Sequence, residues 1–192
     1  EATGVKAHFG LLSCGASVEL IRAAKAKGLP VTADVAMHQL HLTEQLIDGF
    51  NSLAHVRPPL RSEQDKELLR QGLKQGVIDA ICTHHEPLSS SAKMAPFAET
   101  QPGITAFDTY VALGIQLINE GLFEPLEWVT KVTSAPAQVA NMTARWQAEA
   151  GWVLVDPELS WTVSKDTILS QGKNTPLLGQ KLTGKVLQTF AV

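Results

Sequence analysis

Short apolar runs alternate with longer stretches of helical periodicity along the first 145 residues of the chain. The apolar runs that predict strands lie at 5–12, 29–37 and 77–82, and a segment at 52–59 that is expected to be irregular carries a further short apolar run at 53–56. The patterns that predict helices lie at 17–27, 62–75, 107–120, 125–133 and 135–142. Alternation of this kind predicts an α/β fold in which parallel strands are joined by right-handed crossovers.

About four strand-helix units fit before residue 145, whereas a closed eight-unit barrel needs about 250 residues. The sequence therefore predicts either a small open α/β sheet or half of a barrel. After residue 150 the pattern changes to strand-like runs without helices, at 152–157, 161–163 and 182–192. We expect residues 1–149 to form the α/β part and residues 150–192 to form a β-rich C-terminal segment.

The charge and the cysteine content exclude several classes of protein. The chain has 16 Lys and Arg against 19 Asp and Glu, a net charge of −3, which argues against binding to nucleic acid or to a membrane surface. No apolar run approaches the ~20 residues that span a bilayer. Cys14 and Cys82 are expected to be free thiols in a reducing cytoplasm. Because the chain opens at Glu1 within a few residues of a strand-like run, we expect a fragment of a longer protein.

Titratable side chains follow the apolar run at 77–82, in the order Thr83, His84, His85, Glu86. In an α/β barrel, the carboxyl end of a strand is where chemistry is presented. His84, His85 and Glu86 form either a metal site or a hydrogen-bonded polar cluster. His38 and His41, with Gln39 between them, leave the same two alternatives open.

Three further features have a functional and a structural interpretation. Arg57 and Arg61 flank two prolines, and they either grip an anion such as a carboxylate or form structural ion pairs. Ser13 and Cys14 lack the sequence context of a nucleophile elbow, so nucleophilic catalysis is not expected there. The four tryptophans are expected in the core, unless an exposed pair marks a partner surface: Trp128, Trp146, Trp152 and Trp161.

Several segments, taken in order, resemble one enzyme family. Residues 18–35 are similar to V-E-x-x-R-A-A-K-A-x-G-L-P-V-T-A-[ED]-V, residues 55–62 to [KH]-V-N-P-P-L-R-S and residues 78–88 to I-D-A-I-x-T-D-H-A-P-H. Residues 102–109, 153–157 and 174–186 match further family segments in the same order. The set resembles dihydroorotase, a cyclic-amide hydrolase of the amidohydrolase superfamily. The resemblance implies the C-terminal half, units five to eight, of a (β/α)8 TIM barrel, with part of a small β-rich subdomain. The family's first-strand H-x-H motif would lie in the missing N-terminal half.

The resemblance also implies where a dihydroorotase would hold zinc and substrate. The family's ligand or proton-shuttle positions correspond to Leu11, Gln39 and His84, and its substrate positions to Arg57 and Leu88. A leucine cannot coordinate a metal and a glutamine is a poor zinc ligand, so these positions are expected to be degenerate. No cofactor is expected, and only His84 and His85 are weak candidates for a metal.

The resemblance is greatest to the inactive dihydroorotase-like chains that accompany bacterial aspartate carbamoyltransferase. It implies a non-catalytic homologue in pyrimidine biosynthesis that acts as a structural partner of the catalytic chain of that enzyme. The expected partners are that chain and the missing half of the barrel, in an oligomer. The alternative is a zinc-dependent cyclic-amide hydrolase with atypical ligands, and a third possibility is a regulatory protein that binds a small anion at Arg57.

Overall fold

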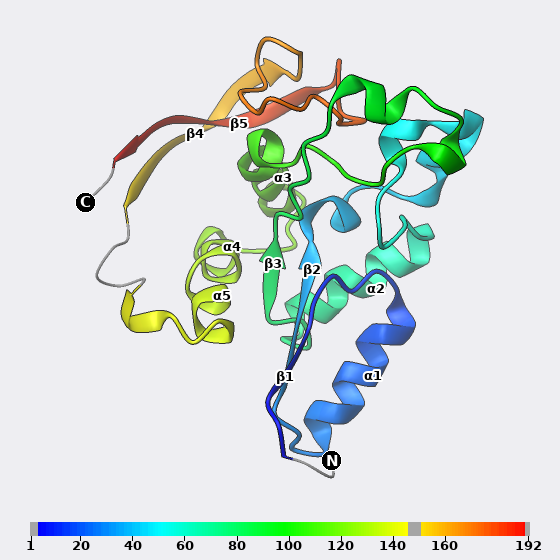
Figure 1. Ribbon diagram of the computed structural model, residues 1–192. Helices are drawn as coiled ribbons and strands as arrows, with labels where there is room; N and C mark the ends of the chain where they lie inside the picture. Colours follow the sequence, from blue (N-terminus) through cyan, green and yellow to red (C-terminus); the bar gives the residue numbers. More distant parts are fainter. Residues whose placement is uncertain (1–3, 146–150, 191–192) are drawn as a thin grey trace.

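Three parallel strands form the centre of the computed structural model, which describes residues 4–145 and 151–190 (Figure 1). The strands are β1 (Ala7–Phe9), β2 (Val31–Ala36) and β3 (Ala80–Cys82), in the order β1-β2-β3. Ala7 lies opposite Val31, and Asp34 lies opposite Ala80. The predicted α/β class with parallel strands is confirmed. The carboxyl ends of all three strands therefore meet at one edge of the sheet.

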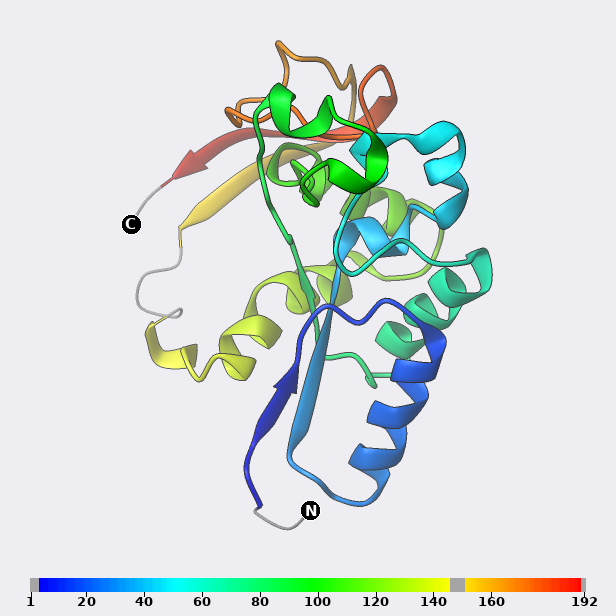
Figure 2. The same cartoon turned by 45° about the vertical axis from the view of Figure 1, so that its right-hand side comes forward.

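The helices lie on both sides of this sheet. Helices α1 (Gly15–Ala26) and α2 (Glu63–Lys74) lie side by side on one side, and α4 (Pro125–Val132) and α5 (Ser134–Val139) lie on the other (Figures 1 and 2). Helix α3 (Phe107–Asn119) packs against α4 and the C-terminal hairpin. Among the described residues, no helix is both long enough and apolar enough to cross a membrane.

Helix α2 illustrates how the sequence sets these elements. The Ser62 hydroxyl accepts a hydrogen bond from the Asp65 backbone N–H at 3.1 Å and so caps the helix. Leu69 and Leu73, four residues apart, are fully buried on the face that packs toward the sheet. The predicted range 62–75 therefore matches the observed helix within one residue at each end.

The short apolar run at 53–56, in the segment expected to be irregular, does not form a strand. Its first residues lie in a 3-10 helix, η3 (Ser52–Ala54), and Ala54 and Val56 are buried beside Leu60 and Ile104 in a second small core. Loop packing buries this apolar run without strand pairing. The predicted loop at 86–101 likewise contains two short 3-10 helices, η4 (Ser90–Lys93) and η5 (Phe97–Glu99). Two more, η1 (Met37–Leu40) and η2 (Glu44–Phe50), follow β2.

The C-terminal segment forms a long antiparallel hairpin of β4 (Trp152–Thr162) and β5 (Lys181–Phe190). The runs predicted as two strands, 152–157 and 161–163, are parts of β4, which has an irregular register between Asp156 and Ser160. Strand β5 approaches α3 closely, since a Cβ atom on Gly184 would lie 2.3 Å from Ile115 Cδ1. The predicted boundary at residue 150 and Trp146 lie outside the described residues.

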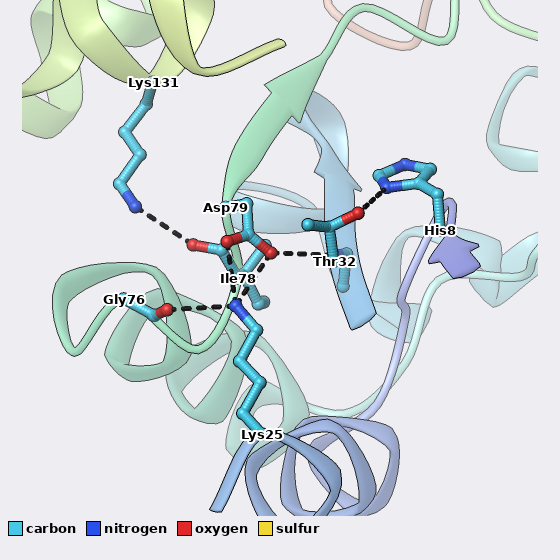
Figure 3. Close-up of polar contacts among 8 residues, drawn as sticks. His8, Lys25, Thr32, Gly76, Ile78, Asp79 and Lys131 are labelled. Atoms are coloured by element: carbon cyan, nitrogen blue, oxygen red, sulfur yellow. Dashed lines mark hydrogen bonds and ion pairs between the residues drawn. The ribbon is translucent and has the colours of Figure 1, made fainter. Parts of the chain in front are cut away.

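An ion pair and several hydrogen bonds fix the amino end of the sheet, opposite the edge where the candidate site lies. The Asp79 carboxylate accepts hydrogen bonds from Lys25 Nζ and from the Ala33 backbone N–H, each at 2.8 Å (Figure 3). Lys131 Nζ donates to the carbonyl of Ile78 at 3.0 Å (Figure 3). These contacts join α1 and α4 to the strands and hold the framework on which the carboxyl-end residues are placed.

Candidate functional site

Asp34, on β2, joins the carboxyl ends of the three strands. Its carboxylate accepts hydrogen bonds from the Leu11 backbone N–H at 2.7 Å and from His8 Nε2 at 2.9 Å. The Cys82 thiol, at the end of β3, donates to the same carboxylate at 3.4 Å. Burial, reinforced by this carboxylate, raises the pKa of the Cys82 thiol, which keeps it protonated and unreactive. Both cysteines are free thiols, as predicted.

Leu11, which the sequence comparison predicts to stand at a ligand position, lies just beyond β1. Its backbone has a positive φ of 59°, a left-handed conformation that is unusual for leucine. Its N–H donates to the Asp34 side chain and the Leu12 N–H donates to the Asp34 backbone carbonyl at 2.9 Å, beyond the end of β1, which is shorter than the predicted 5–12 run. The side chain at this position offers no atom that could bind a metal ion.

Gln39, at the second position predicted to be degenerate, donates hydrogen bonds to the backbone. Its side chain is 2% exposed, and Nε2 donates to the carbonyls of Pro58 at 3.1 Å and Pro59 at 3.3 Å. These bonds hold the segment that follows the cis peptide bond between Arg57 and Pro58. The amide is thereby committed to a structural contact, which does not fit a role as a zinc ligand.

His38 and His84 form a stacked pair at the ends of β2 and β3. Their ring centroids lie 5.4 Å apart, and His38 is only 2% exposed. Burial, together with the neighbouring His84, lowers the pKa of His38 to about 3, so its ring is neutral at physiological pH. Within the described residues, both ring nitrogens of His38 and Nδ1 of His84 lack a hydrogen-bond partner.

His84 and His85, adjacent in sequence, face different surroundings. His84 Nε2 lies 3.5 Å from a Glu86 carboxylate oxygen. His85 Nδ1 instead accepts hydrogen bonds from the backbone N–H groups of Ala106 and Phe107 at 3.1 Å, and its ring stacks on Phe107 at 3.9 Å. His85 therefore caps the start of α3, a role that its sequence context did not indicate.

The remaining predicted positions do not converge on a metal site. Arg57 is exposed, and the Leu88 backbone N–H donates to Asn174 Oδ1 at 2.7 Å. Burial and the Arg70 charge lower the pKa of His41 to about 4, and its Nε2 has no partner in the part of the chain that the structure describes. In residues 4–145 and 151–190, no group of three or more His, Cys, Asp or Glu side chains is placed to hold a metal ion.

The chain is similar in sequence to dihydroorotases and dihydroorotase-like proteins. No family model matches the chain. A dihydroorotase-like protein of Pseudomonas aeruginosa is 42% identical over 99% of this chain, and one of Pseudomonas putida is 40% identical. A dihydroorotase of Syntrophus aciditrophicus is 37% identical. The resemblance to dihydroorotase is confirmed. The chain spans 45% of the length of each of these relatives.

The solved structures agree with the predicted fold. The chain superposes on a D-hydantoinase from Thermus sp. with a TM-score of 0.87 and 23% identity, over 96% of this chain and 43% of that one. It also superposes on an inactive dihydroorotase-like domain of a Chaetomium thermophilum CAD-like multifunctional protein, with a TM-score of 0.69 and 20% identity, over 95% and 48% of the two chains. The fold is that of part of an amidohydrolase TIM barrel, as predicted.

Proposed function

We propose that this dihydroorotase-like protein is a non-catalytic member of de novo pyrimidine biosynthesis that supports the assembly of aspartate carbamoyltransferase. The observation that carries the proposal is the state of the three ligand positions. Leu11 offers no donor, Gln39 is bonded to two backbone carbonyls, and His84 stands where the family has its proton-shuttling aspartate. Hydrolysis of a cyclic amide by zinc needs a bound water and a nearby carboxylate, which these side chains do not supply.

An exposed apolar surface supports the structural part of the proposal. On β4, Trp152 is 75% exposed and Leu154 is 51% exposed, and Phe190 of β5, which pairs with Trp152, is also exposed. Because alternate side chains of a strand lie on one face, these three residues form an apolar surface, which is typical of a protein–protein contact. A role in assembly would explain why the chain has the fold of a dihydroorotase, although the side chains at the proposed ligand positions cannot hold zinc.

Co-expression with the catalytic chain of aspartate carbamoyltransferase tests this role. We expect the two proteins to elute together on size-exclusion chromatography, at a mass above that of either one alone. Trp152→Ser should weaken this association, whereas Leu169→Ser, at a residue that is 90% exposed on a separate loop, should leave it unchanged. Separate elution of the two wild-type proteins would contradict the proposal.

One observation favours the alternative of a metal-dependent hydrolase with atypical ligands. The unpartnered nitrogens of buried His38 and His84 are groups that normally find a hydrogen bond or a ligand. Stoichiometric zinc in the purified full-length protein would support this alternative, with further ligands from outside the described residues. The third possibility, a small anion held at exposed Arg57, predicts heat on titration with dihydroorotate or carbamoyl aspartate that Arg57→Gln abolishes.

A further inference from the structure

A cavity whose lining includes neither His38 nor His84 lies beside the loop that follows β3. It occupies about 410 Å³ between the segments at 52–53, 88–94 and 165–178, which lie next to one another at one end of the molecule (Figures 1 and 2). Close packing joins two of these segments, since a Cβ atom on Gly172 would lie 2.5 Å from the Leu88 backbone nitrogen. The walls are thus held in place by backbone contacts.

The charge of this cavity differs from that of the whole chain. Three lysines line it, Lys93, Lys165 and Lys173, whereas none of the described lining residues is an aspartate or a glutamate. The chain as a whole has a net charge of −3. Three cations without a lining carboxylate favour an anionic occupant.

Lys93 is the strongest indication that the occupant is an anion. It is 7% exposed, and its Nζ donates one hydrogen bond, to the neutral carbonyl of His55 at 3.0 Å. Burial lowers the pKa of Lys93, and only the more distant Glu86 carboxylate acts in the opposite direction. A buried ammonium group is normally paired with an anion, and no carboxylate of the described residues makes that contact.

The other lining groups indicate what kind of anion fits. The hydroxyls of Ser89 and Ser90 and the amide of Gln171 add hydrogen-bonding groups on one part of the wall. The apolar lining residues are Leu53, Leu88, Met94 and Leu178. A cavity of this size with both kinds of lining suits a small ligand with a charged head and an apolar body.

We propose that this cavity binds a small phosphate monoester whose organic group is apolar, with the phosphate placed at the three lysines. A phosphate monoester carries a charge of about −1.5 to −2 at neutral pH, which matches three ammonium groups better than a monoanionic carboxylate does. The proposal is independent of the assembly role, because none of these residues occupies a degenerate catalytic position except Leu88, which contributes only apolar surface.

Isothermal titration of the full-length protein with phenyl phosphate at low ionic strength tests the proposal. We expect one binding site, weakened by added salt. Inorganic phosphate should bind less tightly because it leaves the apolar wall uncovered, and benzoate should bind less tightly because it carries a single charge. Absence of heat at about 10 mM phenyl phosphate, or tighter binding of benzoate, would overturn the proposal.

Variants identify the site. Lys165 makes no hydrogen bond or ion pair with the described residues, so Lys165→Gln should fold normally and weaken phenyl phosphate binding about threefold. Lys93→Met should weaken binding tenfold or more, on the order expected for a lost bond to a charged group. If Lys93→Met fails to fold, the double variant Lys165→Gln, Lys173→Gln decides, with an expected loss of about tenfold. Lys181→Gln, outside the cavity, is the matched control, and an equal loss in this variant would refute the assignment.

Discussion

The stacked histidine pair makes a quantitative prediction about stability at low pH. His38 is 2% exposed, and burial lowers its pKa to about 3, whereas a histidine in an unfolded chain has a pKa of about 6.5. Below pH 6.5 the unfolded chain therefore binds a proton that the folded protein does not bind. His38 thus makes the folded state lose stability as the pH falls, by about 1.4 kcal/mol per pH unit down to about pH 3.

Between about pH 7 and about pH 5 this linkage amounts to a loss of about 2 kcal/mol from His38 alone. The assay is urea unfolding followed by tryptophan fluorescence at the two pH values, with the free energy of unfolding extrapolated to water. His38→Met removes the titrating ring and keeps an apolar side chain of similar length. Its free energy of unfolding should depend on pH less than that of the wild type, by about 2 kcal/mol over this interval.

Leu40→Met is the matched control for this experiment. Leu40 lies in the same 3-10 helix and is fully buried, so the substitution disturbs packing without removing a titrating group. It should keep the pH dependence of the wild type. The reasoning is refuted if His38→Met and the wild type lose the same free energy of unfolding between the two pH values.

Three further predictions concern the framework. Gly114→Ala should lower the free energy of unfolding by about 1–3 kcal/mol, because the added Cβ would lie 2.2 Å from the Trp128 ring. The loss should be smaller in a Trp128→Phe background, and equal losses in both backgrounds, measured by urea unfolding, would contradict this packing. Ser62→Ala should lower the free energy of unfolding by about 1 kcal/mol, because it removes the cap of α2. An unchanged midpoint of urea unfolding would show that the cap contributes nothing to stability. Asp79→Asn should lower the free energy of unfolding by about 1–3 kcal/mol, because it weakens the bonds to Lys25 and to the Ala33 backbone N–H. An unchanged thermal unfolding temperature would contradict this prediction.

The parts of the fold that the sequence predicted well depend on local interactions. Helix α2 needs only the Ser62 cap and the spacing of Leu69 and Leu73, and all three features lie within one short segment. The strands were predicted too long because the apolar runs extend beyond the residues that pair, before Ala80 in β3 and on both sides of β1. Which residues pair depends on a neighbouring strand more than 20 residues away, as in the pairing of Ala7 with Val31.

The candidate site was only partly predictable, because much of it depends on contacts between residues that lie far apart in the sequence. The prediction that Leu11, Gln39 and His84 stand at degenerate positions came from comparison with family motifs, without any geometry. The role of Asp34 depends on partners as distant as Cys82, 48 residues away, and nothing in the local sequence marks it. His85 was a metal candidate in the sequence, but it caps α3 because the start of that helix folds back against the end of β3.

Turnover of dihydroorotate by the full-length protein, with and without added zinc, tests the central claim most directly. Under the proposed function, Leu11 and Gln39 offer no usable ligand and His84 stands in place of the proton-shuttling aspartate, so we predict no ring opening above the protein-free rate under either condition. Zinc-dependent turnover that a chelator abolishes and zinc restores would contradict the non-catalytic role.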